Sequence, residues 1–265
     1  MICIACENHY TKLSKSHVIP NFFRKRMTGV NDDGTVKFAF TWINRKDLPN
    51  QDLPKPNLMC SVCDSRLGAT VERNIPSLLM PSDVNKWSEW KKLPIRSHHL
   101  MDIFNTPLWV GIYDYPLMEQ NLLERFALSV AWRALHDISR EGRSLSSSFL
   151  SSQRGQLCNK LAREYIFDSK LGADIQPASL YFLGPKSAKI MSGNENEMPF
   201  AWAELGESGE IFGVGVVIGF WIILWPLFDL SAADYFQKME KLENLCFIHW
   251  VGKIKSELDP EWLNA

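Results

Sequence analysis

Two cysteine pairs bracket the first quarter of the chain and constrain its fold more than any other feature. They read Cys3-Ile4-Ala5-Cys6 and Cys60-Ser61-Val62-Cys63. Each C-x2-C turn can direct two thiolates toward one tetrahedral zinc ion, and a structural zinc site needs four such ligands. The spacing therefore predicts a structural zinc site formed by Cys3, Cys6, Cys60 and Cys63. The alternatives are two unrelated pairs or a redox-active dithiol.

The segment between the pairs is poor in core-forming residues. Residues 27–57 are rich in Gly, Asn, Asp and Pro, which indicates loops, with a short hairpin near Val36–Ile43. Such a chain buries little apolar surface, so a bound metal would supply much of its folding free energy. We therefore expect residues 1–80 to form a zinc module. Residues 81–265 would form a second domain that binds substrate or a partner.

The larger region has the pattern of an α+β fold, with helices followed by a mostly antiparallel buried sheet. Expected helices cover 119–139, 146–167 and 231–243, the last with Ser231 as N-cap. A linker or short helix is expected over 82–92. Expected strands cover 108–113, 179–183, 200–205 and 211–225.

An uncharged run from Ile211 to Phe228 raises the question of a membrane span. Its length is at the lower limit for a spanning helix. Its glycines, proline and β-branched and aromatic residues instead favour buried strands, with Gly219 as the bend between them. We expect buried sheet, with a membrane span as the alternative.

Composition fits a soluble globular protein, with 46% hydrophobic and 22% charged residues. Met1 leads directly into the first cysteine pair, without a basic and apolar leader, so we expect a cytoplasmic protein. Six cysteines in that setting favour metal binding over disulfides. Cys158 and Cys246 stand alone and are expected to be buried small hydrophobes rather than reactive thiols.

His17 lies outside both cysteine pairs and is therefore available for chemistry other than zinc binding. It precedes Val18-Ile19-Pro20, which should start extended because proline disfavours helix at the preceding residue. A histidine on an extended segment beside a zinc knuckle can act as a general base with a near-neutral pKa. A surface or core histidine without a catalytic role is the alternative. His9, three residues past the first pair, could replace one thiolate, but with four cysteines present we expect it to be a surface residue.

The same segment resembles the HNH family of metal-dependent nucleases in its treble-clef, or ββα-metal, form. The most similar branch reads C-x2-C, S-H-I-I-P, Q-D-x-x-K and C-x2-C-[DE], followed by a further acidic residue. The corresponding elements here are Cys3/Cys6, Ser16-His17-Val18-Ile19-Pro20, Gln51-Asp52-Leu53-Pro54-Lys55, Cys60/Cys63-Asp64 and Glu72. The resemblance covers about residues 1–76 and implies a treble-clef fold for this module.

The resemblance also implies a mechanism. His17 would deprotonate the water that attacks a scissile phosphate. A divalent ion, Mg²⁺ or Mn²⁺, would neutralise the phosphate and stabilise the leaving oxygen. Asp64 and Glu72 occupy the positions of the family's later Asn and His. Asp52 would replace the metal ligand often found just before the histidine, where this chain has Ser16.

The spacing of the two acidic residues allows two arrangements. Asp64 and Glu72 are eight residues apart, which places them on nearly the same face of a helix. They could share one metal, or one could orient His17. Asp64 could instead cap the helix, and Glu72 could be a solvated surface residue.

Basic residues near the histidine are candidate contacts for backbone phosphates, which supply affinity without reading sequence. Residues 1–80 carry 11 Lys and Arg against 7 Asp and Glu, a net +4, whereas residues 81–265 carry 18 against 23, a net −5. A polyanion would therefore meet the N-terminal part. Arg24–Arg26 could instead be the polar side of a short helix. The candidates are Arg24, Lys25, Arg26, Arg45, Lys46 and Lys55.

These observations favour a metal-dependent HNH-type endonuclease that acts on DNA, with RNA as a further possible substrate. The resemblance makes a role in bacterial or phage conflict plausible. The first alternative is a non-catalytic zinc module in a nucleic-acid-binding or regulatory protein. The second is a membrane-associated effector that uses residues 211–228.

Overall fold

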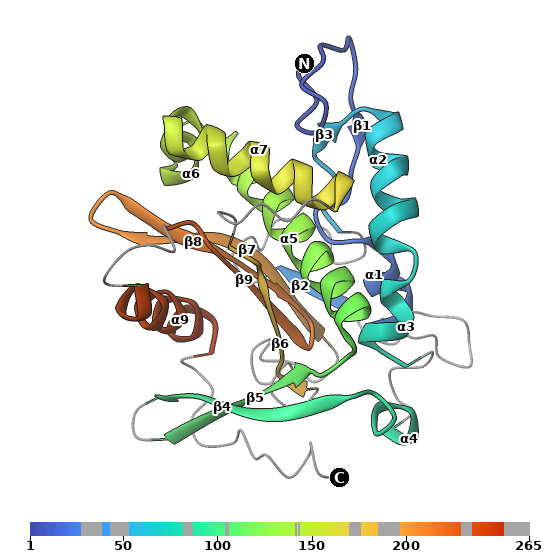
Figure 1. Cartoon of the computed structure of the whole chain (residues 1–265), viewed down its shortest axis with the longest axis vertical. Coiled ribbons are helices and arrows are strands. Elements are labelled where there is room, and N and C mark those ends of the chain that lie inside the picture. Colours follow the sequence, from blue (N-terminus) through green and yellow to red (C-terminus); the bar gives the residue numbers. More distant parts are fainter. Residues whose placement is uncertain are drawn as a thin grey trace.

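A mixed sheet with helices on both faces forms the centre of the molecule (Figure 1). The structure is a computed structural model. Of the 265 residues it describes 1–27, 39–42, 53–81, 87–103, 106–140, 142, 144–169, 176–184, 197–228 and 235–251.

Seven described strands form the central sheet, in the order β2-β7-β8-β9-β6-β5-β4. β2 pairs with β7 in parallel, and the other neighbouring pairs are antiparallel. The expected antiparallel sheet is therefore confirmed, and it contains β4, which the sequence pattern did not indicate. The strands cover Ala39–Trp42 (β2), Ile95–Ile103 (β4), Thr106–Tyr113 (β5), Ser179–Phe182 (β6), Glu197–Glu207 (β7), Glu210–Ile218 (β8) and Trp221–Pro226 (β9).

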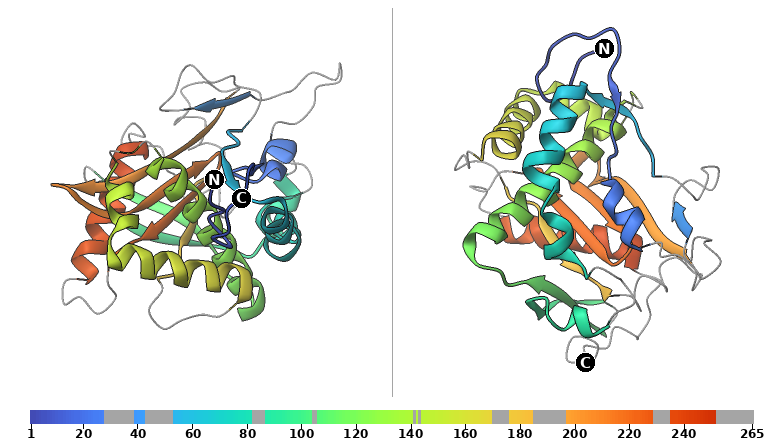
Figure 2. Two further views of the ribbon diagram at one scale, coloured as in Figure 1. Left: turned by 90° about the horizontal axis from the view of Figure 1, so that it is seen from above. Right: turned by 90° about the vertical axis from the view of Figure 1, so that its right-hand side faces the viewer.

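Helices cover both faces of this sheet (Figures 1 and 2). The long helix α5 crosses one face against β6 to β9, and α6 and α7 pack on it. Helix α9 packs against β7, β8 and β9 on the other face. The helices cover Leu117–Ser139 (α5), Leu145–Ser151 (α6), Gln153–Asp168 (α7) and Tyr235–Val251 (α9).

The uncharged run from Ile211 to Phe228 forms β9, the middle strand of the sheet, and most of its neighbour β8. Gly219 makes the bend between them with a φ of 54°, the glycine-first arrangement of a tight hairpin. Val216 packs in the hydrophobic cluster under α5, whereas Val217 packs in the cluster that includes α9. Because both faces are covered, both sets of side chains are apolar. The buried-strand prediction is confirmed, and none of the described helices is long and apolar enough to cross a membrane.

The single helix expected over 146–167 is wrong, because the chain breaks at Ser152 into α6 and α7. Ser152 adopts an extended conformation, with φ −77° and ψ 157°, and its Oγ accepts a hydrogen bond from the Gly155 backbone N–H at 3.0 Å. Ser152 is therefore the N-cap of α7, a role that serine fills well. Gly155 lets the two helices approach, since a Cβ there would lie 1.8 Å from the Phe149 carbonyl oxygen.

The N-terminal region packs on α5 and α7 with short elements of its own (Figure 2). β1 and β3 are antiparallel, and a helix follows directly after β3. That helix ends in a π-helical turn, η1, which reaches Glu72. The elements are Ser14–Lys15 (β1), Asn21–Met27 (α1), Asn57–Met59 (β3), Ser61–Leu67 (α2), Gly68–Glu72 (η1), Ile75–Leu79 (α3) and Trp87–Trp90 (α4).

The N-terminal region shares its hydrophobic core with the sheet. Phe23 on α1 stacks on Phe126 of α5, with ring centroids 6.1 Å apart, and meets Trp221 of β9 edge-on at 5.3 Å. Of the hairpin expected near Val36–Ile43, the structure describes β2, which pairs with β7 rather than with a neighbour in sequence. Residues 1–80 thus contribute a strand to the sheet built by residues 81–265.

We predict that Gly155→Ala lowers the free energy of unfolding by about 1–3 kcal/mol, because the new methyl group would clash with the Phe149 carbonyl. Gly68→Ala is the matched control, since a Cβ at Gly68 meets nothing within 4 Å and alanine is the better helix former. Urea unfolding followed by circular dichroism measures both. Equal stability of the two variants would contradict the packing described at the α6–α7 junction.

Candidate metal centre and its surroundings

The four cysteines of the two pairs meet in space. Their sulfur atoms all lie within 4.8 Å of one another, with Cys3 and Cys60 buried and Cys6 and Cys63 partly exposed. Four thiolates about 2.3 Å from a tetrahedral zinc ion would be roughly 3.8 Å apart. The cluster can therefore hold a metal ion such as zinc, as the spacing predicted.

Each pair is shaped by its own local structure. In the first turn, the Glu7 N–H donates to the Cys3 carbonyl at 2.9 Å, and the Cys3 N–H donates to the Asn8 carbonyl at 3.1 Å. In the second, Cys60 is the N-cap of α2 and its N–H donates to Cys3 Sγ at 3.3 Å. Cys63 lies in the first turn of that helix, where the helix dipole favours a thiolate.

The thiols of the cluster are not equally ready to ionise. Burial raises the pKa of Cys3 and Cys63, and the neighbouring thiol of Cys60 raises that of Cys63 further. Burial also acts on Cys60, but hydrogen bonds from Tyr10 and Cys63 outweigh it and lower its pKa to about 6. The pKa of Cys6 is lowered too, because hydrogen bonds from the backbone and Tyr10 outweigh burial. A cation would let all four become thiolates at once, so metal affinity should fall as the pH drops.

Tyr10 is a neighbour of the cluster that sequence reasoning missed. Its hydroxyl lies 3.7 Å from Cys6 Sγ, and hydrogen bonding with Cys60 and Cys6 raises its pKa. The phenol thus remains a donor to the sulfur ligands, the kind of contact that orients metal ligands. The signal in the sequence was weak: a tyrosine four residues past the first pair.

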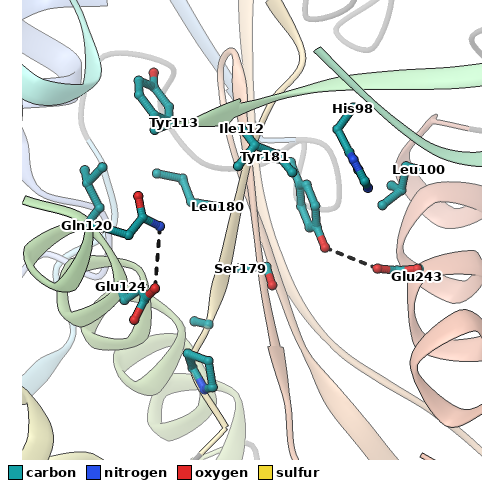
Figure 3. A pocket seen from close by; sticks show the side chains of 13 residues that line it. His98, Leu100, Ile112, Tyr113, Gln120, Glu124, Ser179, Leu180, Tyr181 and Glu243 are labelled. Atoms are coloured by element: carbon teal, nitrogen blue, oxygen red, sulfur yellow. Dashed lines mark hydrogen bonds between the residues drawn. The ribbon is translucent and has the colours of Figure 1, made fainter. Parts of the chain in front are cut away.

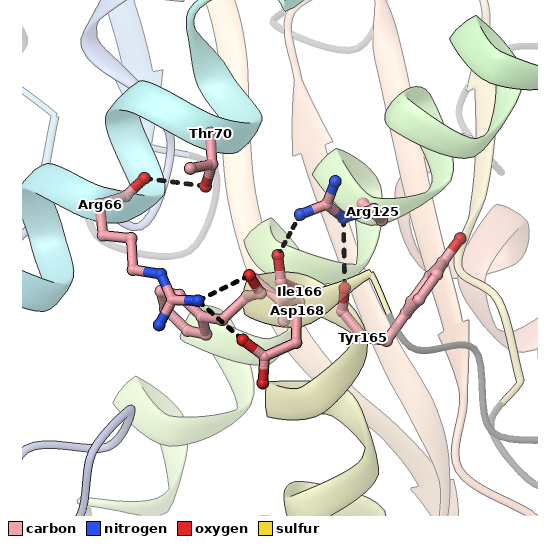
Figure 4. A network of polar contacts seen from close by, with 7 residues as sticks. Arg66, Thr70, Arg125, Tyr165, Ile166 and Asp168 are labelled. Carbon is pink, nitrogen blue, oxygen red and sulfur yellow. Dashed lines mark hydrogen bonds and ion pairs between the residues drawn. The ribbon is translucent and has the colours of Figure 1, made fainter.

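Ion pairs join the metal-binding segment to helix α7. Arg163 Nη1 lies 2.7 Å from Glu7 Oε1, beside the first knuckle. Arg66 on α2 contacts Asp168 Oδ1 at 2.7 Å and the Phe167 carbonyl at 3.0 Å (Figure 4). The Arg66–Asp168 pair is exposed on both sides, so it contributes little to stability but helps to fix orientation. The Arg163 side chain is mostly buried, whereas Glu7 is exposed.

Arg133 of α5 binds two of the residues singled out from the sequence. Its side chain is 2% exposed. Nη1 donates to the His17 carbonyl oxygen at 2.7 Å, and Nη2 lies 2.8 Å from Glu72 Oε1. Nε also donates to the Ser129 carbonyl, one turn earlier in the helix, at 3.0 Å. A buried guanidinium thus holds the His17 segment and the Glu72 turn together.

Helical spacing places Asp64 and Glu72 on one face but far apart along the axis. At a rise of 1.5 Å per residue, eight residues separate them by roughly 12 Å along the helix axis. In the described ranges, only the four cysteines bring three or more potential metal-ligand atoms of His, Cys, Asp or Glu close together. Because Arg133 contacts both Glu72 and the His17 carbonyl, these contacts favour the arrangement in which Glu72 helps to orient the His17 segment. Asp52 lies outside the described residues.

The residues predicted to contact phosphate differ in their exposure and in their contacts. Lys25 is exposed on α1. Arg26 donates from Nη1 to the carbonyls of Pro76, at 2.6 Å, and Met80, at 3.2 Å, so it ties α1 to the end of α3. The Arg24 backbone belongs to α1, and Lys55 is partly exposed ahead of β3. Arg45 and Lys46 lie outside the described residues.

Comparison with known proteins gives no match: no family model, no curated protein and no solved structure is significantly similar to this chain.

We predict that purified protein contains one zinc ion per chain and that Cys63→Ser removes it and lowers the melting temperature. Loss of one thiolate leaves three ligands for a site that needs four. Cys158→Ser, which changes a cysteine on α7 away from the cluster, should retain zinc. Elemental analysis by mass spectrometry measures both. Zinc-free wild-type protein, or zinc retained at full occupancy in Cys63→Ser, would be inconsistent with the site.

We predict that Arg133→Met lowers the free energy of unfolding by about 2–4 kcal/mol. The change leaves Glu72 without its partner, and the effect falls below that of a fully buried pair because Glu72 is 20% exposed. The control is Arg140→Met near the end of the same helix. Arg140 is exposed and donates to the Asn57 carbonyl, so its loss should cost under about 1 kcal/mol.

A double variant tests the origin of this effect. Glu72→Gln should restore part of the stability lost in Arg133→Met, because it removes the uncompensated carboxylate. Chemical unfolding of the four proteins gives the coupling free energy. Strict additivity of the two changes would show that Arg133 does not stabilise the structure through Glu72.

Proposed function

We propose that this chain is an HNH-type metal-dependent nuclease that hydrolyses phosphodiester bonds of nucleic acid, with DNA as the expected substrate. Two short antiparallel strands, β1 and β3, with a helix directly after β3 and a four-cysteine cluster beside them, support this proposal. In this proposal they belong to a treble-clef module scaffolded by zinc.

The observation that carries the proposal is the double contact of Arg133. The family resemblance assigns catalytic roles to His17 and to an acidic residue at position 72, and Arg133 binds both segments at hydrogen-bond distance. Residues 55 positions apart in sequence are thereby held at one place in the fold. Such fixed positioning is what a catalytic pair requires.

In this proposal His17 is the general base and takes a proton from the attacking water. Glu72, oriented by Arg133, is the carboxylate that shares a binding partner with the His17 segment. A divalent ion, Mg²⁺ or Mn²⁺, would neutralise the negative charge on the phosphate and on the leaving oxygen. Asp64 lies near the start of the helix and would act at most through solvent or substrate. Lys25 is an exposed cation on α1 that suits a backbone phosphate.

A second candidate function is a zinc module that binds nucleic acid without cutting it. One observation favours it: among the residues that the structure describes, the only ready-made metal cluster is the four cysteines. Glu72 is also already engaged by a buried arginine. In this alternative, Arg133 has only a structural role, and residues 81–265 provide a protein-binding surface.

Plasmid nicking separates the two candidates. We predict Mg²⁺- or Mn²⁺-dependent conversion of supercoiled plasmid to open circles, reduced at least about 100-fold in His17→Ala because the general base is lost. His9→Ala is the matched control, since His9 is an exposed histidine of the same region outside the cluster. It should keep full activity and full zinc content.

The other outcomes are also decisive. Full nicking by His17→Ala would remove His17 from the mechanism. Binding to DNA and RNA oligonucleotides, with no cleavage of either at any tested metal concentration, would establish the binding module instead.

A further inference from the structure

A cavity of about 230 Å³ lies in a different part of the molecule, where strands β5 and β6 separate (Figure 3). The described register joins these strands through one pair, Gly111 and Phe182. Farther along, β6 remains paired with β9, while its other edge faces the cavity. The space is therefore a slot in the sheet rather than a surface dimple.

The slot reaches both faces of the sheet. Leu180 and Tyr181 are successive residues of β6, so their side chains point to opposite faces. Leu180 belongs to the hydrophobic cluster on the α5 side, and Tyr181 belongs to the cluster on the α9 side. Both line the cavity. An elongated ligand could therefore lie with one end toward each helix.

A carboxylate stands at each end of the slot (Figure 3). Glu124 projects from α5 and accepts a hydrogen bond from Gln120 Nε2 at 3.5 Å. Glu243 projects from α9 and accepts one from the Tyr181 hydroxyl at 3.2 Å. Within the described part of the chain, neither carboxylate is paired with a lysine or arginine.

The lining between the carboxylates is mixed: polar atoms come from residues such as His98 and Ser179, and an apolar wall lies beside them. Ile112, Leu123 and Leu180 contribute hydrocarbon surface to the cavity wall. Burial raises the pKa of Glu243, the result expected when no cation offsets the loss of water. An anion is disfavoured by the two carboxylates. A bare metal ion is a poor fit, because no three ligand groups converge here among the described residues.

We propose that this slot binds a linear aliphatic diamine, with one ammonium group on Glu124 and the other on Glu243. The methylene chain would pack on the apolar wall between them. The volume is below the usual range for drug-sized ligands, roughly 300–1,000 Å³, so it suits a ligand of this small size. Helix α5 carries both Glu124 and Arg133, so the ligand would contact the helix that also holds the candidate catalytic segments.

Titration calorimetry on the full chain tests the proposal with 1,4-diaminobutane, 1,6-diaminohexane and spermidine. Butylamine, with one ammonium group, and 1,4-butanediol, with none, are the controls. We expect saturable binding of at least one diamine, with butylamine about tenfold or more weaker because one charged hydrogen bond is lost.

Variants locate the site. Glu124→Gln and Glu243→Gln should each weaken diamine binding about tenfold or more, for the same reason. Glu240→Gln, an exposed residue on the same helix as Glu243, should bind nearly as well as wild type. Ser179→Leu fills the slot without removing a charge and should also abolish binding. Melting curves without ligand report whether each variant folds.

Three results would overturn the proposal. The first is the absence of saturable binding of every diamine to the wild-type chain. The second is equal affinity for butylamine and the diamines. The third is unchanged diamine affinity in folded Glu124→Gln, Glu243→Gln or Ser179→Leu protein.

Discussion

The arrangement of the candidate site depends on one buried positive charge. An arginine side chain does not give up its proton in a protein, so Arg133, at 2% exposure, must be matched by acceptors. They come from its own helix, from the His17 carbonyl and from the Glu72 carboxylate. Any movement of the N-terminal region away from α5 would leave that charge unpaired in the protein interior. Separating either segment from α5 is therefore energetically costly.

The cysteine cluster and this arginine have complementary effects. A metal on four thiolates would fix the knuckles to each other, whereas Arg133 fixes the following segments to the helical layer. The pairs Arg66–Asp168 and Arg163–Glu7 join the same region to α7, and the exposed Arg66 pair adds orientation more than stability. A continuous hydrophobic core under α5 also attaches the N-terminal region to the sheet, since it contains both Phe23 and Trp221.

Much of this architecture could be predicted because it depends on local patterns. Three features could be predicted from residues close together in sequence. They are the metal site from the cysteine spacing, helix α5 from its periodicity, and strands β8 and β9 from their uncharged run. The break at Ser152 was missed because a serine inside a helical pattern is equally typical of a surface position, and its capping role is visible only in its extended backbone and its hydrogen bond from Gly155. β2 was missed as a sheet member because its partner, β7, lies far away in sequence.

The candidate site was only partly predictable, for a related reason. His17 and Glu72 come from a motif, but Arg133 lies in an apolar helix and has no motif to mark it. Its role depends on which residues the fold places opposite it, and this is a long-range property. Helical periodicity predicted that the side chains of Asp64 and Glu72 point to the same side of the helix. It did not account for their separation along the helix axis.

Manganese anomalous scattering tests the central claim most directly. Crystals of the protein with an uncleaved DNA oligonucleotide and Mn²⁺ should show, apart from the metal on the cysteines, a manganese peak beside Glu72 and the phosphate. Its water should lie within about 2.6–3.2 Å of a His17 ring nitrogen. Bound DNA with metal density at the cysteines alone, or a manganese ion remote from both residues, would contradict the account.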